Sequence, residues 1–158
     1  MSVAETHRGT IAAVCVSAVR GVQKEPVAEI ELLVDHGARG DAHAGDWHRQ
    51  VSLLSDEAAD RIRAKGVAID AGDFGENILT RGIDLLAVPV GGRIRLGGAG
   101  VLLEVTQIGK VCHDPCAIYA QAGECIMPTQ GIFCRVVRGG TVRPGDAIEI
   151  ADGAADLA

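Results

Sequence analysis

Aromatic side chains are scarce in this chain of 158 residues, which contains one Trp, one Tyr and two Phe. Hydrophobic residues still make up 47% of the sequence, so the core must be built from Val, Ile, Leu and Ala. β-branched residues favour strands, and the 21 glycines supply turns between them. This composition predicts a β-rich domain of short strands.

An excess of positive charge is also missing, because the formal net charge is -6. Binding to nucleic acid or to an anionic membrane needs clustered Lys and Arg, which are thinly spread along this chain. We therefore expect no nucleic-acid partner and no membrane partner.

Long apolar segments are absent as well. No apolar run approaches the length of a membrane span, and residues 1–8 show no basic start followed by an apolar stretch. We therefore expect a cytoplasmic, reducing location. In such a compartment, a set of five cysteines indicates thiolate or metal chemistry rather than a disulfide framework.

Short apolar runs separated by glycine turns recur along the chain. One main helix is predicted from Ser55, a suitable N-cap, to Lys65, with Gly66 after its end. We expect strands over residues 10–19, 28–34, 83–88, 93–96, 101–108, 131–137 and 147–150. Closure removes the edges that short antiparallel strands would expose. The fold class predicted is mainly β, a small closed β-barrel or barrel-like sandwich with one main helix and short helical turns.

The domain organisation follows from the length of the chain. A chain of 158 residues is expected to form a single domain, with a core over about 10–150 and a frayed tail over 151–158.

Four of the five cysteines lie in the segment 109–134, after a predicted strand. Cys112 has Lys110 two residues before it and His113 directly after it. A nearby cation lowers the pKa of a thiol, and the thiolate is the form that attacks sulfur or binds a soft metal. We interpret Cys112 as the reactive or metal-ligating thiolate, with Cys116 or Cys125 as a second thiol.

A tetrahedral zinc site is the alternative for this segment. Thiolate and imidazole are preferred zinc ligands, and the candidate set is Cys112, His113, Cys116, Cys125 and Cys134. The spacing argues against zinc because no C-x-x-C pair is present. Cys134 lies in an alternating strand and, like Cys15, is expected to be a core residue.

Two glycine-containing loops carry further polar residues. The first, residues 40–50, holds His43 and His48 with Asp41 and Asp46, which form a weak metal pattern or a polar loop bonded to its own backbone. Arg49 follows, and a guanidinium group grips planar oxyanions, although a surface salt bridge is the alternative. The second loop, residues 72–77, superficially suggests a phosphate-binding loop. It lacks the spacing of a Rossmann or Walker loop, and the alternative is a tight hairpin connection.

Taken in order, these motifs resemble the MOSC domain, which is named for the C-terminal part of molybdenum cofactor sulfurases. The resemblance extends from about Thr10 to Ile150. It is carried by residues 40–45 (GDAHAG), 49–54 (RQVSLL), 72–78 (GDFGENI), 90–98 (VGGRIRLGG) and a cysteine after residues 103–107 (LEVTQ).

The resemblance implies a β-barrel that binds the molybdenum cofactor (molybdopterin), with Cys112 as the key thiol and candidate metal ligand. Fixed cations are needed for the cofactor's phosphate, and Lys110, Arg49 and Arg135 are candidates in this acidic chain. The cofactor-binding residues expected are His43, Arg49, Gly75, Glu76, Asn77, Lys110, His113 and Arg135.

The function expected is a carrier, insertion or sulfur-transfer factor acting through a cysteine thiolate or persulfide. Its partners would be the cofactor, cofactor-biosynthesis proteins or apo-molybdoenzymes. The chain shows no pyridoxal-phosphate desulfurase domain, so the resemblance does not imply that it takes sulfur from free cysteine. A small molybdenum-dependent reductase with a Cys ligand, and a zinc-stabilised interaction module, remain the alternatives.

Overall fold

The structure is a computed structural model that describes residues 7–19, 23–98, 100–109 and 130–151. Strands dominate it, and one α-helix, α2 (Asp56–Arg63), and one short 3-10 turn, η1 (Leu85–Ala87), are present in these ranges. The strands are β1 (Arg8–Val16), β2 (Glu25–Val27), β3 (Ile30–Leu33), β4 (Gly37–Ala38), β5 (Val51–Ser55), β6 (Ile78–Arg81), β7 (Arg93–Leu96), β8 (Val101–Ile108), β9 (Ile132–Arg138), β10 (Gly140–Val142) and β11 (Ala147–Ile150).

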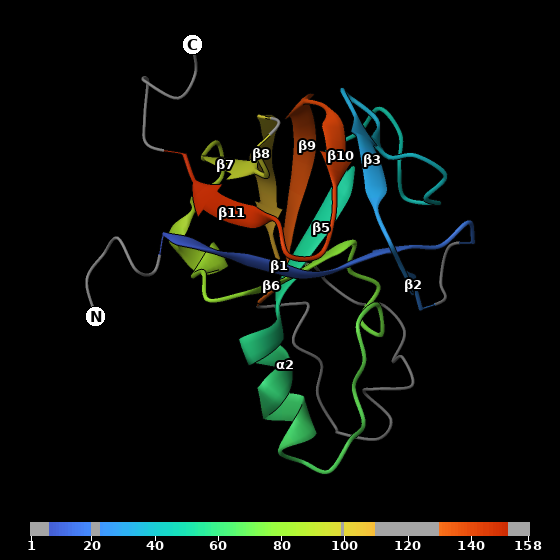
Figure 1. Ribbon diagram of the computed structural model, residues 1–158, viewed down its shortest axis with the longest axis vertical. Helices are drawn as coiled ribbons and strands as arrows, with labels where there is room; N and C mark the ends of the chain where they lie inside the picture. Colours follow the sequence, from blue (N-terminus) through green and yellow to red (C-terminus); the bar gives the residue numbers. More distant parts are fainter. Residues whose placement is uncertain (1–6, 20–22, 99, 110–129, 152–158) are drawn as a thin grey trace.

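The main sheet closes into a barrel of seven strands, as the composition and the resemblance predicted. The strand order is β11-β7-β8-β9-β5-β6-β1, and β11 pairs again with β1 to complete the circle. All these pairings are antiparallel except that of β5 with β6, which is parallel. β2 extends the sheet beyond β1, and β10, β3 and β4 form a second, three-stranded sheet beside the barrel (Figure 1).

Aliphatic side chains fill the barrel, because one face of each strand points inward. Ile11, Leu53, Ile78, Ile94 and Leu103 are among the fully buried members of this cluster. The two described cysteines are also inaccessible: Cys134 belongs to this cluster and Cys15 is 0% exposed. Both are core residues, as their strand positions predicted.

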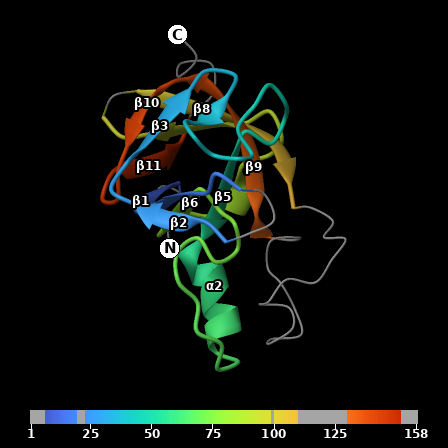
Figure 2. The ribbon, with the colours of Figure 1, turned by 90° about the vertical axis from the view of Figure 1, so that its right-hand side faces the viewer.

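A second apolar cluster lies between the barrel and α2, which projects from one end of the barrel (Figures 1 and 2). Ala59 and Ile62 are the buried residues of the helix, and Phe133 of β9 belongs to the same cluster. Ser55 is the N-cap residue, as predicted, but its hydroxyl donates to Glu57 Oε1 at 3.1 Å rather than capping the helix backbone. This cluster ties the helix to the outer side of β5, β6 and β9.

Some predicted elements were wrong. The expected strand 83–88 does not form: this segment contains the turn η1 instead, because Gly82 adopts a positive φ of 85° and the chain turns after β6. The expected strand 28–34 is present but shorter, as β3, and it belongs to the second sheet, where it pairs with β10 and β4. β5 and β6 were not predicted as strands; they belong to the motif segments around residues 51 and 78. Within the described ranges, no helix is long and apolar enough to cross a membrane.

Candidate functional site

The first glycine-containing loop connects β4 to β5 and surrounds a buried ion pair. Lys24, which precedes β2, places its Nζ 2.8 Å from Asp41 Oδ1, and the two side chains are 1% and 0% exposed. The same Nζ lies 3.0 Å from Nδ1 of His43, whose side chain is 38% exposed. Asp41 also accepts hydrogen bonds from the backbone N–H groups of Ser17 at 3.0 Å and His43 at 3.1 Å.

The charge state of Asp41 follows from these contacts. Burial by itself would raise the pKa of Asp41, but the hydrogen bonds from Lys24 and Ser17 outweigh it and hold that pKa below its ordinary value. Asp41 is therefore a carboxylate that neutralises the Lys24 ammonium. This pair removes Asp41 from the metal pattern considered for the loop. No group of three or more His, Cys, Asp or Glu side chains suited to a metal ion occurs among the described residues.

Lys24 was missed by sequence reasoning, although it joins the two loops. Its backbone N–H donates to Gly72 O at 2.9 Å, and the Gly72 N–H in turn donates to Glu76 Oε2 at 2.8 Å. Gly72 has a φ of 89°, and a Cβ there would lie 2.0 Å from Lys24 O, so only glycine permits this approach. A lone lysine before a short strand carries no local signal that predicts its burial.

The second loop points its acidic side chain into the protein. Glu76 is 1% exposed and accepts hydrogen bonds from the backbone of Gly72 and, at 3.2 Å, of Phe74. Burial raises the pKa of Glu76 to about 7, although the backbone donors act in the opposite direction. Glu76 therefore organises its own loop and titrates near neutral pH.

Asn77, also 1% exposed, connects three strands. Its Oδ1 accepts from Ser52 N at 3.1 Å in β5, and its Nδ2 donates to Cys15 O at 3.1 Å in β1. Its own backbone N–H donates to Ser52 O at 3.0 Å at the start of β6. Glu76 thus bonds to its own loop, and Asn77 bonds to the neighbouring strands. The contacts of both side chains in this structure are structural.

Arg49 differs from these residues. Its guanidinium carbon lies 4.8 Å from the ring centroid of Trp47 and 5.8 Å from that of Phe133. Such cation–π contacts hold the group in place without neutralising its charge. Its Nε is buried and has no hydrogen-bond partner in the described part of the chain, where no carboxylate pairs with it either. Trp47 and Phe133 were not predicted as site residues, although the position of the only Trp in this loop was noticeable.

Arg49 lies where the cysteine-containing segment leaves and re-enters the barrel. Phe133, which it contacts, pairs with Gln107 near the end of β8. At this end the N–H of Gly109 donates to Gly131 O at 2.7 Å, and the Thr106 hydroxyl donates to His48 O. The backbone on both sides of the segment 110–130 is therefore joined beside the first loop.

The other predicted site residues have different surroundings. Arg135 is paired with two carboxylates, Glu104 at 2.8 Å and Asp35 at 3.4 Å, which compensate its charge. Gly75 has a φ of 80°, and no described atom lies within 4 Å of where its Cβ would be. The remaining predicted residues lie outside the described ranges: Lys110, Cys112, His113, Cys116 and Cys125.

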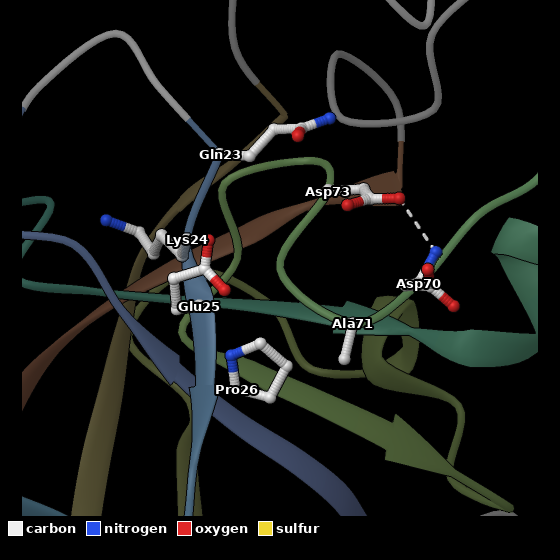
Figure 3. Close-up of a pocket in the computed structure, with 7 residues that line it drawn as sticks. All are labelled: Gln23, Lys24, Glu25, Pro26, Asp70, Ala71 and Asp73. Carbon is white, nitrogen blue, oxygen red and sulfur yellow. Dashed lines mark hydrogen bonds between the residues drawn. The ribbon is translucent and has the colours of Figure 1, made fainter.

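An open pocket of about 460 Å³ lies beside the second loop, between residues 23–26 and 70–73. Its charged lining includes Glu25, Asp70 and Asp73, while the Lys24 side chain extends away from Asp70 and Asp73 toward the first loop (Figure 3). Carboxylates repel an anion, so this pocket is not suited to a phosphate group. The anion-compatible surface is at Arg49 instead.

Comparisons with known proteins agree with this architecture. A sequence model of the MOSC domain matches residues 40–149. The fold is similar to that of the YuaD protein from Bacillus subtilis, with a TM-score of 0.72 and 21% identity over 90% of this chain and 95% of that one. YiiM from Geobacillus stearothermophilus gives a TM-score of 0.64 and 20% identity over 90% and 75% of the two chains. YiiM from Escherichia coli gives 0.62 and 19% over 92% and 70%. A comparison with curated protein sequences finds no match.

Proposed function

Because this chain belongs to the MOSC domain family, which is associated with the molybdenum cofactor, we propose that it binds that cofactor. The site proposed is the end of the barrel where the first loop meets the junction of Gly109 and Gly131. The single observation that supports it most strongly is the state of Arg49, a fixed cation without a described acceptor.

The chemistry of Arg49 fits an anionic ligand. A half-buried guanidinium group retains a strong demand for acceptors, because removal from water weakens its hydration. Trp47 and Phe133 both contact the guanidinium group, so little side-chain entropy remains to be lost when an oxyanion binds. A phosphate oxygen beside Nε would satisfy both the missing hydrogen bond and the missing negative charge.

The remaining candidates differ in how well they fit. His43 lies on the same loop as Arg49. Its partly exposed side chain contacts the buried pair of Lys24 and Asp41. No described atom fills the space beside the Gly75 backbone, so a ligand could lie there. The hydrogen bonds of Glu76 and Asn77 hold this part of the loop in place. Arg135 would have to share its charge with its carboxylates, which makes it the weaker of the two described arginine candidates.

Cys112 stands three positions after Gly109 in the sequence and remains the proposed thiol of the site. When bound, the cofactor supplies a molybdenum–dithiolene centre, a soft metal site that suits a thiolate ligand. The role proposed is that of a carrier, insertion or sulfur-transfer factor, with Cys116 or Cys125 as the second thiol. Cofactor-biosynthesis proteins or apo-molybdoenzymes would be the partners, in the cytoplasm.

A binding measurement tests this proposal. The purified protein is loaded anaerobically with molybdenum cofactor, and the bound amount is followed by molybdenum content and pterin fluorescence. A charge-assisted hydrogen bond contributes about 1.5–3 kcal/mol, so Arg49→Leu should weaken binding about 10- to 100-fold. Arg138→Leu is the matched control, because this exposed arginine lies at the other end of β9 from Phe133.

Outcomes other than selective loss at Arg49 would change the proposal. Equal losses in the Arg49 and Arg138 variants would show only a general electrostatic effect. Stoichiometric zinc that disappears in Cys112→Ser and Cys125→Ser, with no bound pterin, would replace the proposal with a zinc-stabilised interaction module. Reduction of N-hydroxylated compounds by the loaded protein with an artificial donor would instead identify a reductase.

A further inference from the structure

The protonation of His43 determines what this residue offers a ligand, and the structure contains the groups that control it. A neutral imidazole carries one hydrogen, on either Nδ1 or Nε2, and the other nitrogen accepts. Nδ1 faces the Lys24 Nζ at 3.0 Å, whereas the nearest approach to Asp41 is 3.9 Å, to Oδ2. The lysine is therefore the hydrogen-bonding neighbour of Nδ1.

In this contact Lys24 can act only as a hydrogen-bond donor. Its ammonium is buried against the Asp41 carboxylate at 2.8 Å. An ammonium group donates hydrogen bonds and accepts none. The contact with His43 therefore requires an unprotonated Nδ1, which leaves the hydrogen on Nε2.

The opposite arrangement would bring two hydrogen-bond donors together. If Nδ1 carried the hydrogen, it would point at the Lys24 ammonium, and its distance of 3.9 Å from Asp41 Oδ2 exceeds a hydrogen bond. Asp41 Oδ2 is already engaged by the backbone N–H of His43 at 3.1 Å. That backbone bond fixes the main chain of His43, and the Lys24 contact determines which ring nitrogen faces inward.

We propose that Lys24 is a positioning residue that holds His43 as a neutral imidazole with its hydrogen on Nε2. His43 then acts as a hydrogen-bond donor toward an oxygen atom of the bound ligand. A histidine that ligates a metal normally donates its second ring hydrogen to a carboxylate or carbonyl, which is the reverse of the arrangement seen here. The ligand contact rests on the proposed function; the protonation of the ring does not.

The same loop couples this donor to Arg49. The indole Nε1 of Trp47 donates to His43 O at 2.7 Å, and the ring of Trp47 lies against the Arg49 guanidinium. Two donor groups on one short loop, one neutral and one cationic, are thus fixed relative to each other through a single aromatic side chain. Such a pair suits a ligand that presents several oxygen acceptors, as a phosphorylated pterin does.

Nitrogen-15 NMR of the wild-type protein without cofactor tests the inference directly. Long-range correlations from the ring carbon-bound hydrogens distinguish protonated from unprotonated ring nitrogens at pH 7. The His43 signals are identified among the five histidines by their disappearance in His43→Gln. We expect one neutral form with the hydrogen on Nε2. A hydrogen on Nδ1, or a doubly protonated ring, would overturn the proposal.

The variant Lys24→Met tests the cause of this preference. Methionine removes the donor, and the Asp41 carboxylate becomes the charged group nearest to Nδ1, so Nδ1 should gain a hydrogen in most molecules. Lys65→Met, at an exposed lysine after α2, is the matched control and should leave the His43 signals unchanged. An unchanged His43 in a folded Lys24→Met protein would contradict the role of Lys24. If that variant does not fold, the wild-type spectrum alone decides.

The two proposals fail separately. A wild-type protein that shows the Nε2 hydrogen but binds no molybdenum cofactor would refute the proposed function and leave the control of His43 by Lys24 intact. A wild-type protein that binds the cofactor but carries the hydrogen on Nδ1 would refute the inference alone.

Discussion

The two glycine-containing loops of this barrel are similar in sequence character and different in how their polar groups are satisfied. In residues 72–77, Glu76 bonds to the loop's own backbone and Asn77 bonds to β1 and β5. In residues 40–50, Asp41 is equally committed to Lys24, but Arg49 keeps a buried donor without a partner in the described structure. In the second loop, Glu76 and Asn77 both have structural hydrogen-bond partners. The first loop combines a structural ion pair with an arginine whose Nε lacks an acceptor in the described structure.

This difference separates two reasons for a polar residue to appear in a motif. A buried polar side chain that has all its partners stabilises a particular backbone path, whereas an unpartnered one is a candidate for contact with a ligand. Substitutions in the first class should change the free energy of unfolding, and those in the second class should change binding. The predictions below test that separation, from the largest expected effect to the smallest.

The largest effect is expected for Asp41→Ala. This substitution leaves the buried Lys24 ammonium without its carboxylate, and breaking a buried pair by removing one partner destabilises by about 3–5 kcal/mol. Urea unfolding at pH 7 measures the change. Asp46→Ala, at an exposed position of the same loop, is the control and should change stability by less than about 0.5 kcal/mol. A loss below about 1 kcal/mol for Asp41→Ala would remove the first loop's scaffold role.

A slightly smaller loss is expected for Asn77→Ala, which tests whether the second loop is only a scaffold. The variant leaves Ser52 N and Cys15 O buried without their side-chain partner, and each unsatisfied group costs about 1–3 kcal/mol. We expect about 3 kcal/mol less stability in urea, while Gln23→Ala, an exposed amide, has little effect. A stable Asn77→Ala protein with reduced cofactor binding would place this side chain on the ligand instead.

The barrel itself could be predicted from sequence because its causes are local or repeated. Alternating β-branched runs and glycine turns predict short strands, and the need to remove exposed edges predicts closure. The burial of Cys15 and Cys134 followed from the same alternation. The parallel pairing of β5 with β6 was missed, because strand pairing between residues 51–55 and 78–81 depends on the helix and loop between them.

The site was less predictable, since its arrangement depends on contacts between distant segments. Lys24 reaches Asp41 across 17 positions, and nothing near it in the sequence indicates that a lysine is buried there. Arg49 was selected for its chemistry, but its lack of a partner depends on which carboxylates the fold brings near. Arg135 has the same chemistry and is neutralised by Glu104 across 31 positions. Residue type therefore identified candidates, and tertiary pairing distinguishes between them.

The pH dependence of stability offers a third test, at Glu76. Burial raises its pKa in the folded protein from 4.5 to about 7, so the folded state binds this proton more tightly than the unfolded chain. The resulting stabilisation is fully present below pH 4.5 and is lost as the pH rises through about 7. Glu76→Gln cannot ionise, so its stability relative to wild type should improve by about 2 kcal/mol from pH 5 to pH 8.

Urea unfolding of both proteins across this pH range measures the change. Glu25→Gln, at an exposed glutamate, should show a flat difference from wild type over the same range. A flat difference for Glu76→Gln as well would mean that the backbone donors from Gly72 and Phe74 offset the burial of this carboxyl group.

The smallest change in stability is expected for Gly75→Ala, which tests whether the second loop contacts the ligand. The φ of 80° is unfavourable for alanine by about 1–2 kcal/mol, but no described atom obstructs the added methyl. Gly66→Ala, with a φ of 86° and equally free space, should destabilise by the same amount. Only Gly75→Ala should weaken cofactor binding, because Gly75 is a proposed cofactor-binding position and Gly66 is not. If both variants bind as wild type, the ligand contacts of the barrel are confined to the first loop and the cysteine segment, and the difference between the two loops is complete.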